Sequence, residues 1–234
     1  MKLAIISDAH GNYPALRSVL AEIDRLDCDR IISLGDVTGY YAQPAECLEA
    51  LMARDVLQLL GNHDNYLVQG SSCDRSRTVA QLILHQRKEI KPHHMEVLRQ
   101  MKPQHDEGEM RFVHGSWADP VDDYLYSLSP ADLPGGQRFY FAGHTHVQHL
   151  AHFENKTFCN PGAVGQPRDG DPRAAFAVLQ DGEITLHRVA YDIEETVRAM
   201  QRAGYEEARL WDNLFIGAQI GGRIDKITIT DTPA

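Results

Sequence analysis

The sequence predicts an α/β fold in which a mixed β sheet is flanked by helices. Short apolar runs, typical of buried strands, alternate with longer amphipathic stretches up to about residue 60. A strand–helix–strand–helix–strand order of this kind implies a parallel sheet with right-handed crossovers. Beyond residue 109 further strand-like runs follow, and the last three of them are expected to be antiparallel.

The opening elements can be assigned in chain order. They are the strand Lys2–Ser7, the helix Pro14–Leu26, the strand Arg30–Leu34, the helix Pro44–Arg54 and the strand Val56–Leu60. The second helix begins at a proline, which suits the first helical turn because its fixed φ is already helical and no hydrogen-bond donor is lost there.

The middle of the chain is expected to be helical before the strands return. Helical segments are predicted at about Arg75–Ile90 and Pro92–Met101, and strands near Met110–Val113 and Arg138–Ala142. The helical segments belong to an insert at about residues 65–101. We expect this insert either to cover the site and select the substrate or to be an ordinary pair of packing helices.

The last part of the chain is predicted to hold an antiparallel group and a helix. The strands are expected at Lys156–Cys159, Ala174–Leu179 and Glu183–Val189. A Gln180-Asp181-Gly182 turn joins the last two strands as a hairpin. The helix at Asp192–Ala203 stops at Gly204, because glycine tolerates the left-handed conformation that ends many helices.

Length and composition favour a single domain over residues 1–234, with a C-terminal helical segment at about residues 192–217. A chain of 234 residues that is 43% hydrophobic can bury a sizeable core. Its formal charge of −10 disfavours general nucleic-acid or anionic-membrane binding, because the long-range field repels polyanions. No stretch is long enough to span a membrane, and four scattered cysteines favour reduced thiols in a cytoplasmic protein.

Polar side chains suited to metal binding follow five of the apolar runs. They occur in the strings S-D-A-H-G-N, L-G-D, L-G-N-H-D, V-H-G and A-G-H-T-H. Because ligands in open α/β folds gather at the carboxyl ends of the strands, these side chains are expected to lie together. The candidate ligands, whose number suggests two metal ions, are Asp8, His10, Asp36, Asn62, His114, His144 and His146.

This set of strings resembles the calcineurin-like metallophosphoesterase superfamily. The likeness runs from Asp8 to about Arg173 and is closest to the small bacterial and archaeal phosphodiesterase branch, which carries D-x-H-G-N, G-D-V-x-G-Y, G-N-H-D and G-H-T-H. The string N-P-G-A-V-G-Q-P-R at Asn160–Arg168 is also typical of that branch. The resemblance implies a two-sheet mixed β sandwich flanked by helices, which is a four-layer αββα fold.

The resemblance also implies how the ligands are divided between two ions. One ion would be held by Asp8, His10, Asp36 and His146. The other would be held by Asp36, Asn62, His114 and His144. Asp36 would therefore be shared, and a hydroxide that bridges the two ions would be the nucleophile.

Charge and ligand type indicate what such a centre would do. Two divalent ions bring four positive charges, of which two carboxylates and a hydroxide cancel three, so about +1 remains to attract phosphate. Metal coordination lowers the pKa of bound water to roughly 7, which makes hydroxide available at neutral pH. Nitrogen and oxygen ligands without thiolate favour Mn, Fe, Zn, Ni or Co over Mg or Ca, and manganese is our first expectation.

His63 is the candidate catalytic residue beyond the ligands. It neighbours Asn62 without matching a ligand position, which suits an imidazolium that faces the phosphate and protonates the departing alkoxide. The alternative is a histidine that only packs beside the site. Asp64 is expected either to orient His63 or to act as a simple loop-capping carboxylate.

Three residues are candidates for substrate binding, and each has a structural alternative. Asn12 could contact substrate or only stabilise its turn. Arg168, like Arg173, could clamp a phosphate or lie in a surface salt bridge. Tyr40, with Tyr41 beside it, could stack on a nucleobase or aryl group or form the edge of the core.

The predicted reaction is hydrolysis of a small phosphate ester, in which a nucleotide is one option and a phosphodiester is favoured. Protein serine/threonine phosphatases of the superfamily carry G-D-x-V-D-R-G, and Tyr40 stands here in place of that arginine. Fewer dedicated cations suit a monoanionic diester better than a dianionic monoester. The alternatives are a phosphomonoesterase or dinucleoside polyphosphate hydrolase and, in another class, a non-catalytic interaction scaffold or nucleotide sensor.

Overall fold

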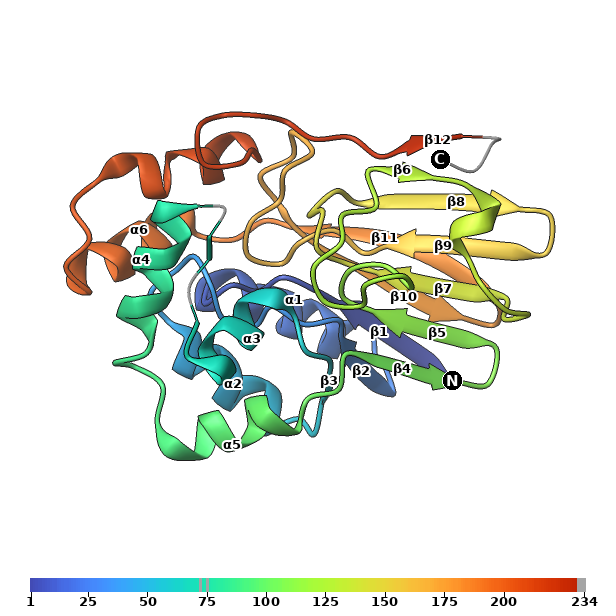
Figure 1. Cartoon of the computed structure of the whole chain (residues 1–234), viewed down its shortest axis with the longest axis horizontal. Coiled ribbons are helices and arrows are strands. Elements are labelled where there is room, and N and C mark those ends of the chain that lie inside the picture. The colour runs from blue at the N-terminus through green and yellow to red at the C-terminus, as the bar shows by residue number, and fades with distance from the viewer. Residues whose placement is uncertain (72, 75, 231–234) are drawn as a thin grey trace.

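Two five-stranded mixed sheets pack face to face in the computed structural model of the chain, which describes residues 1–71, 73, 74 and 76–230 (Figure 1). The first sheet, in the order β11-β10-β1-β2-β3, consists of β1 (Lys2–Ile6), β2 (Arg30–Ser33), β3 (Leu57–Gln58), β10 (Ala174–Gln180) and β11 (Glu183–Val189). The second, in the order β4-β5-β7-β9-β8, consists of β4 (Gln104–Glu107), β5 (Met110–Val113), β7 (Phe139–Ala142), β8 (His149–Phe153) and β9 (Lys156–Asn160). The predicted α/β sandwich is confirmed.

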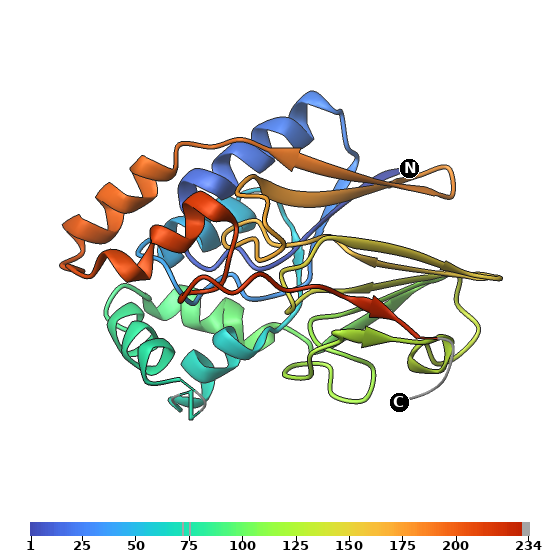
Figure 2. The ribbon, with the colours of Figure 1, turned by 90° about the horizontal axis from the view of Figure 1, so that it is seen from above.

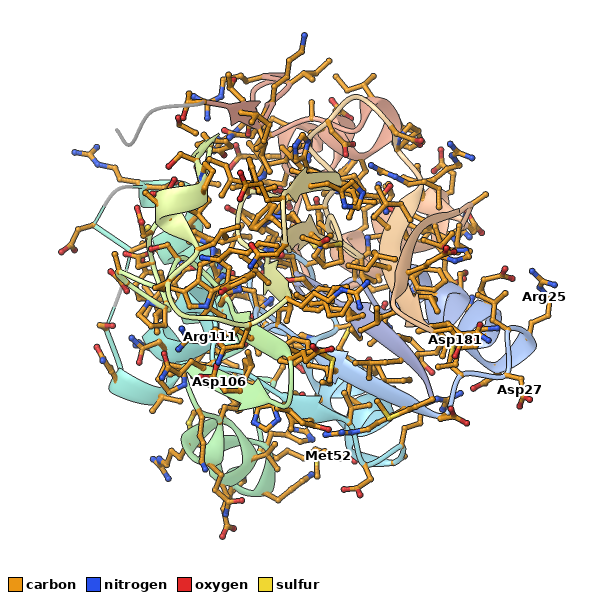
Figure 3. All side chains as sticks on the ribbon, turned by 90° about the vertical axis from the view of Figure 1, so that its right-hand side faces the viewer. Arg25, Asp27, Met52, Asp106, Arg111 and Asp181 are labelled. Atoms are coloured by element: carbon orange, nitrogen blue, oxygen red, sulfur yellow. The ribbon has the colours of Figure 1, made fainter. Side chains whose placement is uncertain are left out.

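The first sheet is parallel at its centre. β1 pairs in parallel with β2, and β2 with β3, whereas β10 runs antiparallel to both β1 and β11. The turn between β10 and β11 is the predicted hairpin, because Asp181 and Gly182 have φ of 52° and 80°. Asp181 projects from the end of the sandwich seen in Figure 3, where Asp106 and Arg111 of the β4–β5 hairpin form an ion pair of 3.0 Å.

The second sheet corrects one prediction. Lys156–Cys159 was expected to be an antiparallel strand, yet β9 pairs in parallel with β7 and is antiparallel only to β8. β8 follows β7 in the chain but lies at the sheet edge, so the hairpin partner β9 fills the place between them. β5 and β7 are also parallel, and their carboxyl ends therefore lie at one edge of the sheet.

Helices gather beside the first sheet. They are α1 (Tyr13–Arg25), α2 (Pro44–Met52), α3 (Asn62–Gln69), α4 (Arg77–Gln86), α5 (Pro92–Gln100) and α6 (Ile193–Arg202). α1, α4 and α6 have the side-chain caps that fix a helix start, because Asn12, Ser76 and Asp192 each accept a backbone hydrogen bond three residues on. Arg75, where the first helical segment of the insert was predicted to begin, lies outside the described residues. None of the described helices has the length and apolar character needed to cross a membrane.

Alternating side chains of β1 divide the core into layers. Leu3 and Ile5 face the second sheet, where Phe112 and Phe141 complete the layer between the sheets. Ala4 and Ile6 point the other way and pack under the helices. In Figure 2, α1 lies along the first sheet and α6 lies beyond the end of this sheet, while the C-terminal strand lies beside the second sheet.

The outer face of the second sheet is covered mainly by irregular chain. Leu125, Leu128 and Leu133 pack there on Tyr140 and Phe158. Within this cover the strand β6 (Ser127–Leu128) pairs in parallel with β12 (Thr228–Ile229), and a short 3-10 helix, η1, spans Pro130–Asp132. The C-terminal region forms the 3-10 helices η2 (Ala208–Leu210) and η3 (Asp212–Ile216) on the helical side of the molecule. It then crosses to the outer face of the second sheet.

Candidate metal centre

All seven predicted ligands lie at the carboxyl ends of parallel strands. They follow β1 (Asp8 and His10), β2 (Asp36), β3 (Asn62), β5 (His114) and β7 (His144 and His146). β1, β2 and β3 belong to one sheet and β5 and β7 to the other. The two sheets therefore bring side chains from distant parts of the chain to the same edge of the sandwich.

The backbone is strained where most of these side chains leave it. Nine described residues other than glycine have a positive φ, and five of them, with φ from 50° to 62°, are Asp8, His10, Asp36, His144 and His146. Each such left-handed residue costs on the order of 1–3 kcal/mol, and this strain is characteristic of functional sites. The strained loop conformations therefore direct these side chains toward one another at a cost in stability.

The first group of side chains consists of Asp8, His10 and His146. The Nδ1 atoms of His10 and His146 lie 2.9 and 2.7 Å from the carbonyl oxygens of Thr38 and Gln166, so each Nδ1–H donates and each Nε2 keeps a lone pair. The two Nε2 atoms are only 3.0 Å apart, and Asp8 Oδ1 lies 3.2 Å from that of His146. Two lone pairs at this distance repel, unless one cation binds both.

The second group consists of Asp36, His114 and His144. His114 Nδ1 lies 3.2 Å from the Leu34 carbonyl oxygen, so in the neutral ring Nδ1–H donates to this oxygen and Nε2 is the acceptor. That Nε2 lies 3.0 Å from Nδ1 of His144 and 3.4 Å from Oδ2 of Asp36. Asp36 Oδ2 is also 3.7 Å from Nε2 of His10, so this carboxylate lies between the two groups.

Several of the candidate ligand atoms are buried and have no hydrogen-bond partner among the described residues. Asp8 Oδ1, Asp36 Oδ2, Asn62 Oδ1 and His144 Nε2 are all in this state. A buried polar atom without a partner costs free energy, and most such atoms in proteins are satisfied. Their convergence at one edge fits a site for cations, since a cation would satisfy all of them together.

Burial and charge keep most of the histidines neutral in the metal-free protein. Burial lowers the pKa of His10, His144 and His146 below its usual range. For His114, burial also lowers the pKa, but Asp36 and Asp8 outweigh it and raise the pKa to about 9. A bound divalent cation would favour the unprotonated form of His114, because only an unprotonated imidazole can bind a metal ion.

His63 lies against the first group, and its backbone nitrogen donates to Asp36 Oδ1 at 2.9 Å, whereas its ring has no hydrogen-bond partner among the described residues. Its ring packs edge-on to His10 with centroids 4.7 Å apart, and its Nδ1 is buried without a partner. Burial lowers the pKa of His63 to about 4, although Asp36 acts in the opposite direction. The ring is therefore neutral at pH 7 before substrate binds, in contrast to the imidazolium that we expected.

Asp64 is fully buried and holds two loops together. It accepts hydrogen bonds from the backbone nitrogens of Val37, Thr38 and Gly61, and from the Thr38 hydroxyl at 2.8 Å. Among the described residues no bond joins it to His63. Burial and the neighbouring Asp36 raise the pKa of Asp64 to about 7. These contacts favour the loop-capping alternative over a role in orienting His63.

Arg168 is a buried guanidinium at the rim of the same site. Only 4% of the residue is exposed, and no carboxylate of the described residues forms an ion pair with it. Its Nη2 donates to Tyr40 Oη at 3.0 Å, and its Nε and Nη2 donate to Gln166 Oε1. Tyr40 in turn packs edge-on against His10, with ring centroids 4.6 Å apart. The arginine is thus held beside the ligands with its charge unpaired.

The other substrate candidates are engaged in structural contacts. Asn12 is buried, caps α1, and also bonds the carbonyl of Gly165 and the hydroxyl of Thr196, which favours its turn-stabilising alternative. Tyr41 is fully buried in the core. Arg173 forms an exposed ion pair with Asp171 at 2.6 Å, as the surface alternative expects.

The calcineurin-like phosphoesterase superfamily domain matches residues 1–182. The chain belongs to this superfamily. A metallophosphoesterase from Sphaerobacter thermophilus is 33% identical, with a TM-score of 0.81 over 93% of this chain and 99% of its own. An uncharacterized protein of Methanocaldococcus jannaschii is 30% identical over 92% of this chain and 98% of its own. A hypothetical protein from Pyrococcus horikoshii OT3, at 17% identity, shares the fold with a TM-score of 0.82 over 93% of this chain and 99% of its own.

Membership of the calcineurin-like superfamily agrees with the divalent-metal chemistry that the donor set favours. Nothing in that membership fixes the identity or number of ions, and the assignment of each ligand remains a proposal. One aromatic neighbour of the site had no sequence signal. Tyr124 stacks on His144 with centroids 3.7 Å apart and on Tyr126 at 5.4 Å. It lies in irregular chain outside the motifs, so only tertiary structure could reveal it.

Proposed function

We propose that the protein is a dinuclear metal-dependent phosphodiesterase. The observation that carries this proposal is the pair of neighbouring buried groups with Asp36 between them, the first of which holds the lone pairs of His10 and His146 only 3.0 Å apart. Such an arrangement is stabilised by cations and by little else in a buried site. The 33% identical relative that is described as a metallophosphoesterase supports an enzymatic role.

The candidate ligands are assigned to two ions. One ion would be held by Asp8, His10, Asp36 and His146. The second ion would be held by Asp36, Asn62, His114 and His144. When bound, two such ions supply hydroxide at neutral pH and stabilise the charge that develops on phosphate oxygens. Manganese is the first candidate, ahead of Fe, Zn, Ni and Co, because the donors are mixed nitrogen and oxygen without thiolate.

His63 and Arg168 are assigned to the substrate itself. The neutral His63 has a free Nδ1 beside the ligands, and an anionic phosphate next to it would raise its pKa and let it pass a proton to the departing oxygen. Arg168 would bind a phosphate oxygen through Nη1, since Nε and Nη2 are already engaged. Tyr40 would act as a positioning residue that holds the guanidinium in place.

A diester is favoured because this chain offers few fixed cations to the phosphate. Arg168 is the one buried arginine among the described residues. A monoanionic diester needs less positive charge than a dianionic monoester. Phosphomonoesterase and dinucleoside polyphosphate hydrolase are the alternative enzymes. A scaffold or a nucleotide sensor without turnover is the alternative of another class, and the intact ligand set weighs against the scaffold.

We also place the protein in the cytoplasm, since its four cysteines are free.

An assay on two matched aryl esters tests the proposal. Purified protein would be given bis(p-nitrophenyl) phosphate and p-nitrophenyl phosphate, each with manganese and with chelator. We expect hydrolysis that the chelator abolishes and a higher kcat/KM for the diester. A preference for the monoester would reassign the enzyme as a phosphomonoesterase, and no hydrolysis of either ester with any of the five metals would favour a binding role.

A further inference from the structure

A cavity of about 550 Å³ opens beside the candidate metal centre. Tyr40 and Arg168 form its inner end, so it is continuous with the site. Thr78 and Val79 of α4 form one wall, and the C-terminal stretch 219–223 forms another. Its volume is within the range of pockets that enclose small organic ligands, and it exceeds what a scissile phosphate alone requires. The cavity therefore has room for a further part of a substrate.

The wall of this cavity is positively charged. Arg168, Arg209 and Arg223 line it, whereas no aspartate or glutamate is among its described lining residues. The chain as a whole has 33 acidic and only 23 basic residues. The wall therefore gathers three guanidinium groups in an acidic chain, of which Arg209 and Arg223 are each paired with an acid and Arg168 is not, and guanidinium groups are the usual binders of phosphate.

Arg209 and Arg223 are exposed arginines, and each is oriented by an acid two residues away in the chain. Glu207 accepts from Nε of Arg209, and Asp225 accepts from Nε of Arg223 at 2.8 Å. Thr78 accepts from Nη1 of Arg209 at 3.3 Å. In both arginines Nη2 has no hydrogen bond to the described residues. A guanidinium held by its Nε edge still has donors for a second anion, which is how arginine bridges two oxyanions.

Asp225 joins the outer arginine to the inner one. This buried carboxylate accepts from the hydroxyl of Tyr126 at 3.1 Å and from Nε2 of Gln219 at 2.5 Å. Its backbone nitrogen donates to the carbonyl oxygen of Arg168 at 2.7 Å. A single residue thus fixes the C-terminal stretch against the rim of the metal centre. The C-terminal stretch is therefore anchored through Asp225, while the side chains of Arg209 and Arg223 lie at the surface.

We propose that this cavity binds a second phosphate of the substrate, so that the preferred substrate is a phosphodiester that carries a further phosphate group. The inference rests on the proposed phosphodiesterase function, because Arg168 and the ligands would bind the scissile phosphate. Arg209 and Arg223 would bind the distal one. Both outer arginines lie after residue 182, where the superfamily domain ends. The C-terminal segment therefore selects the substrate.

Two esters with the same scissile bond test this inference. They are thymidine 5′-(p-nitrophenyl phosphate) and its 3′-phosphorylated analogue, both of which release p-nitrophenolate. We expect kcat/KM to be higher for the 3′-phosphorylated ester by about tenfold or more, the effect of hydrogen bonds to a charged group. In the double variant Arg209→Ala/Arg223→Ala the ratio of the two kcat/KM values should fall toward one. Arg198→Ala is the control, since Arg198 is an exposed arginine of α6 paired with Asp192, and it should keep the wild-type ratio.

The outcomes separate this inference from the proposed function. Hydrolysis of both esters at equal kcat/KM would overturn the second-phosphate site and leave the phosphodiesterase proposal intact. If neither ester is hydrolysed, the phosphodiesterase proposal fails, and calorimetry decides the cavity's role. Tighter binding of thymidine 3′,5′-bisphosphate than of the 5′-monophosphate, lost in the double variant, would support the site. Equal affinities would overturn it.

Discussion

His63 is the residue on which the proposed chemistry depends most. It lies within reach of Asp36 and His10, yet it is buried, neutral at pH 7 and free at Nδ1. We expect His63→Gln to retain its metal content while kcat falls by roughly 10²–10⁴-fold, because acid–base groups contribute that much. Elemental analysis and steady-state kinetics on the diester measure the two effects. A variant with the wild-type rate would remove His63 from the mechanism.

Arg168 and Arg173 provide a matched pair of arginines for substitution. Both were candidates from the sequence, but only Arg168 is buried beside the ligands, whereas Arg173 is paired with Asp171 at the surface. Arg168→Ala should lower kcat/KM for the diester by about 10–150-fold, as expected when a charged hydrogen bond worth about 1.5–3 kcal/mol is lost. Arg173→Ala should leave it unchanged. An equal effect of the two substitutions would contradict the phosphate-binding assignment.

Individual residues were predictable from the sequence to the extent that a motif carried them. The spacing of the strings predicted that Asp8, His10 and Asp36 would converge, and they do. By contrast, neither Arg168 nor Tyr124 could be placed by spacing, because their positions depend on how irregular chain packs. Tertiary contacts decide such cases, and local sequence does not encode them.

The loop after β2 shows how an element shapes the site. Gly39 has a φ of 140°, and a Cβ atom there would lie 2.2 Å from Nδ1 of His10 and 2.8 Å from that of His63. The helix α4 supports the same loop, since Gln86 bonds the nitrogen of Gly39 and the carbonyl of Tyr41. The helical insert is thus connected to the metal centre as well as to the cavity.

A glycine substitution tests this arrangement. Gly39→Ala should displace His10 and lower the metal content and activity, because the added methyl group overlaps the ligand. Gly108→Ala is the control: Gly108 also has a positive φ, 57°, but a Cβ there meets no atom within 4 Å. That variant should lose only the roughly 1 kcal/mol of backbone strain in unfolding free energy. Full metal content in Gly39→Ala would contradict the predicted overlap.

Elements were predictable where their apolar pattern was strong. β1, β5 and β10 agree with prediction within a residue or two because buried strands need apolar runs, and β11, which is not buried, agrees because it follows the predicted hairpin turn. The edge strand β4 has the polar sequence Gln104–Glu107, which gives no such signal. The helix α3 was not predicted, because Asn62 and His63 were assigned to chemistry although they also form its first turn.

The whole molecule is predicted to be stabilised by its metals. The metal-free chain buries four candidate ligand atoms without partners, and bound ions would satisfy them. At a free ion concentration of 100 times Kd, each bound ion adds about 2.7 kcal/mol, which raises Tm by roughly 5–11 °C per ion for a domain of this size. Thermal unfolding with manganese and with chelator measures the difference. Asp36→Asn should show little or no rise, and an equal Tm in both conditions for the wild type would contradict the prediction.

The global arrangement could be predicted only in part. Alternating strands and helices predicted an α/β fold, and the family resemblance supplied the second sheet. That the C-terminal segment returns to form a wall of the cavity was not predictable, because Arg209 and Arg223 meet Arg168 only through the path of residues 203–230. Long-range convergence of this kind depends on packing and has no periodic signature.

The central claim is that two metal ions share Asp36, and metal stoichiometry tests it most directly. Wild-type protein and the Asp36→Asn variant would each be reconstituted with manganese, freed of excess ion and analysed for metal per chain. We predict two ions in the wild type and loss of both in the variant, since the shared ligand loses its charge. Two ions retained by Asp36→Asn, or none bound by the wild type, would contradict the dinuclear centre.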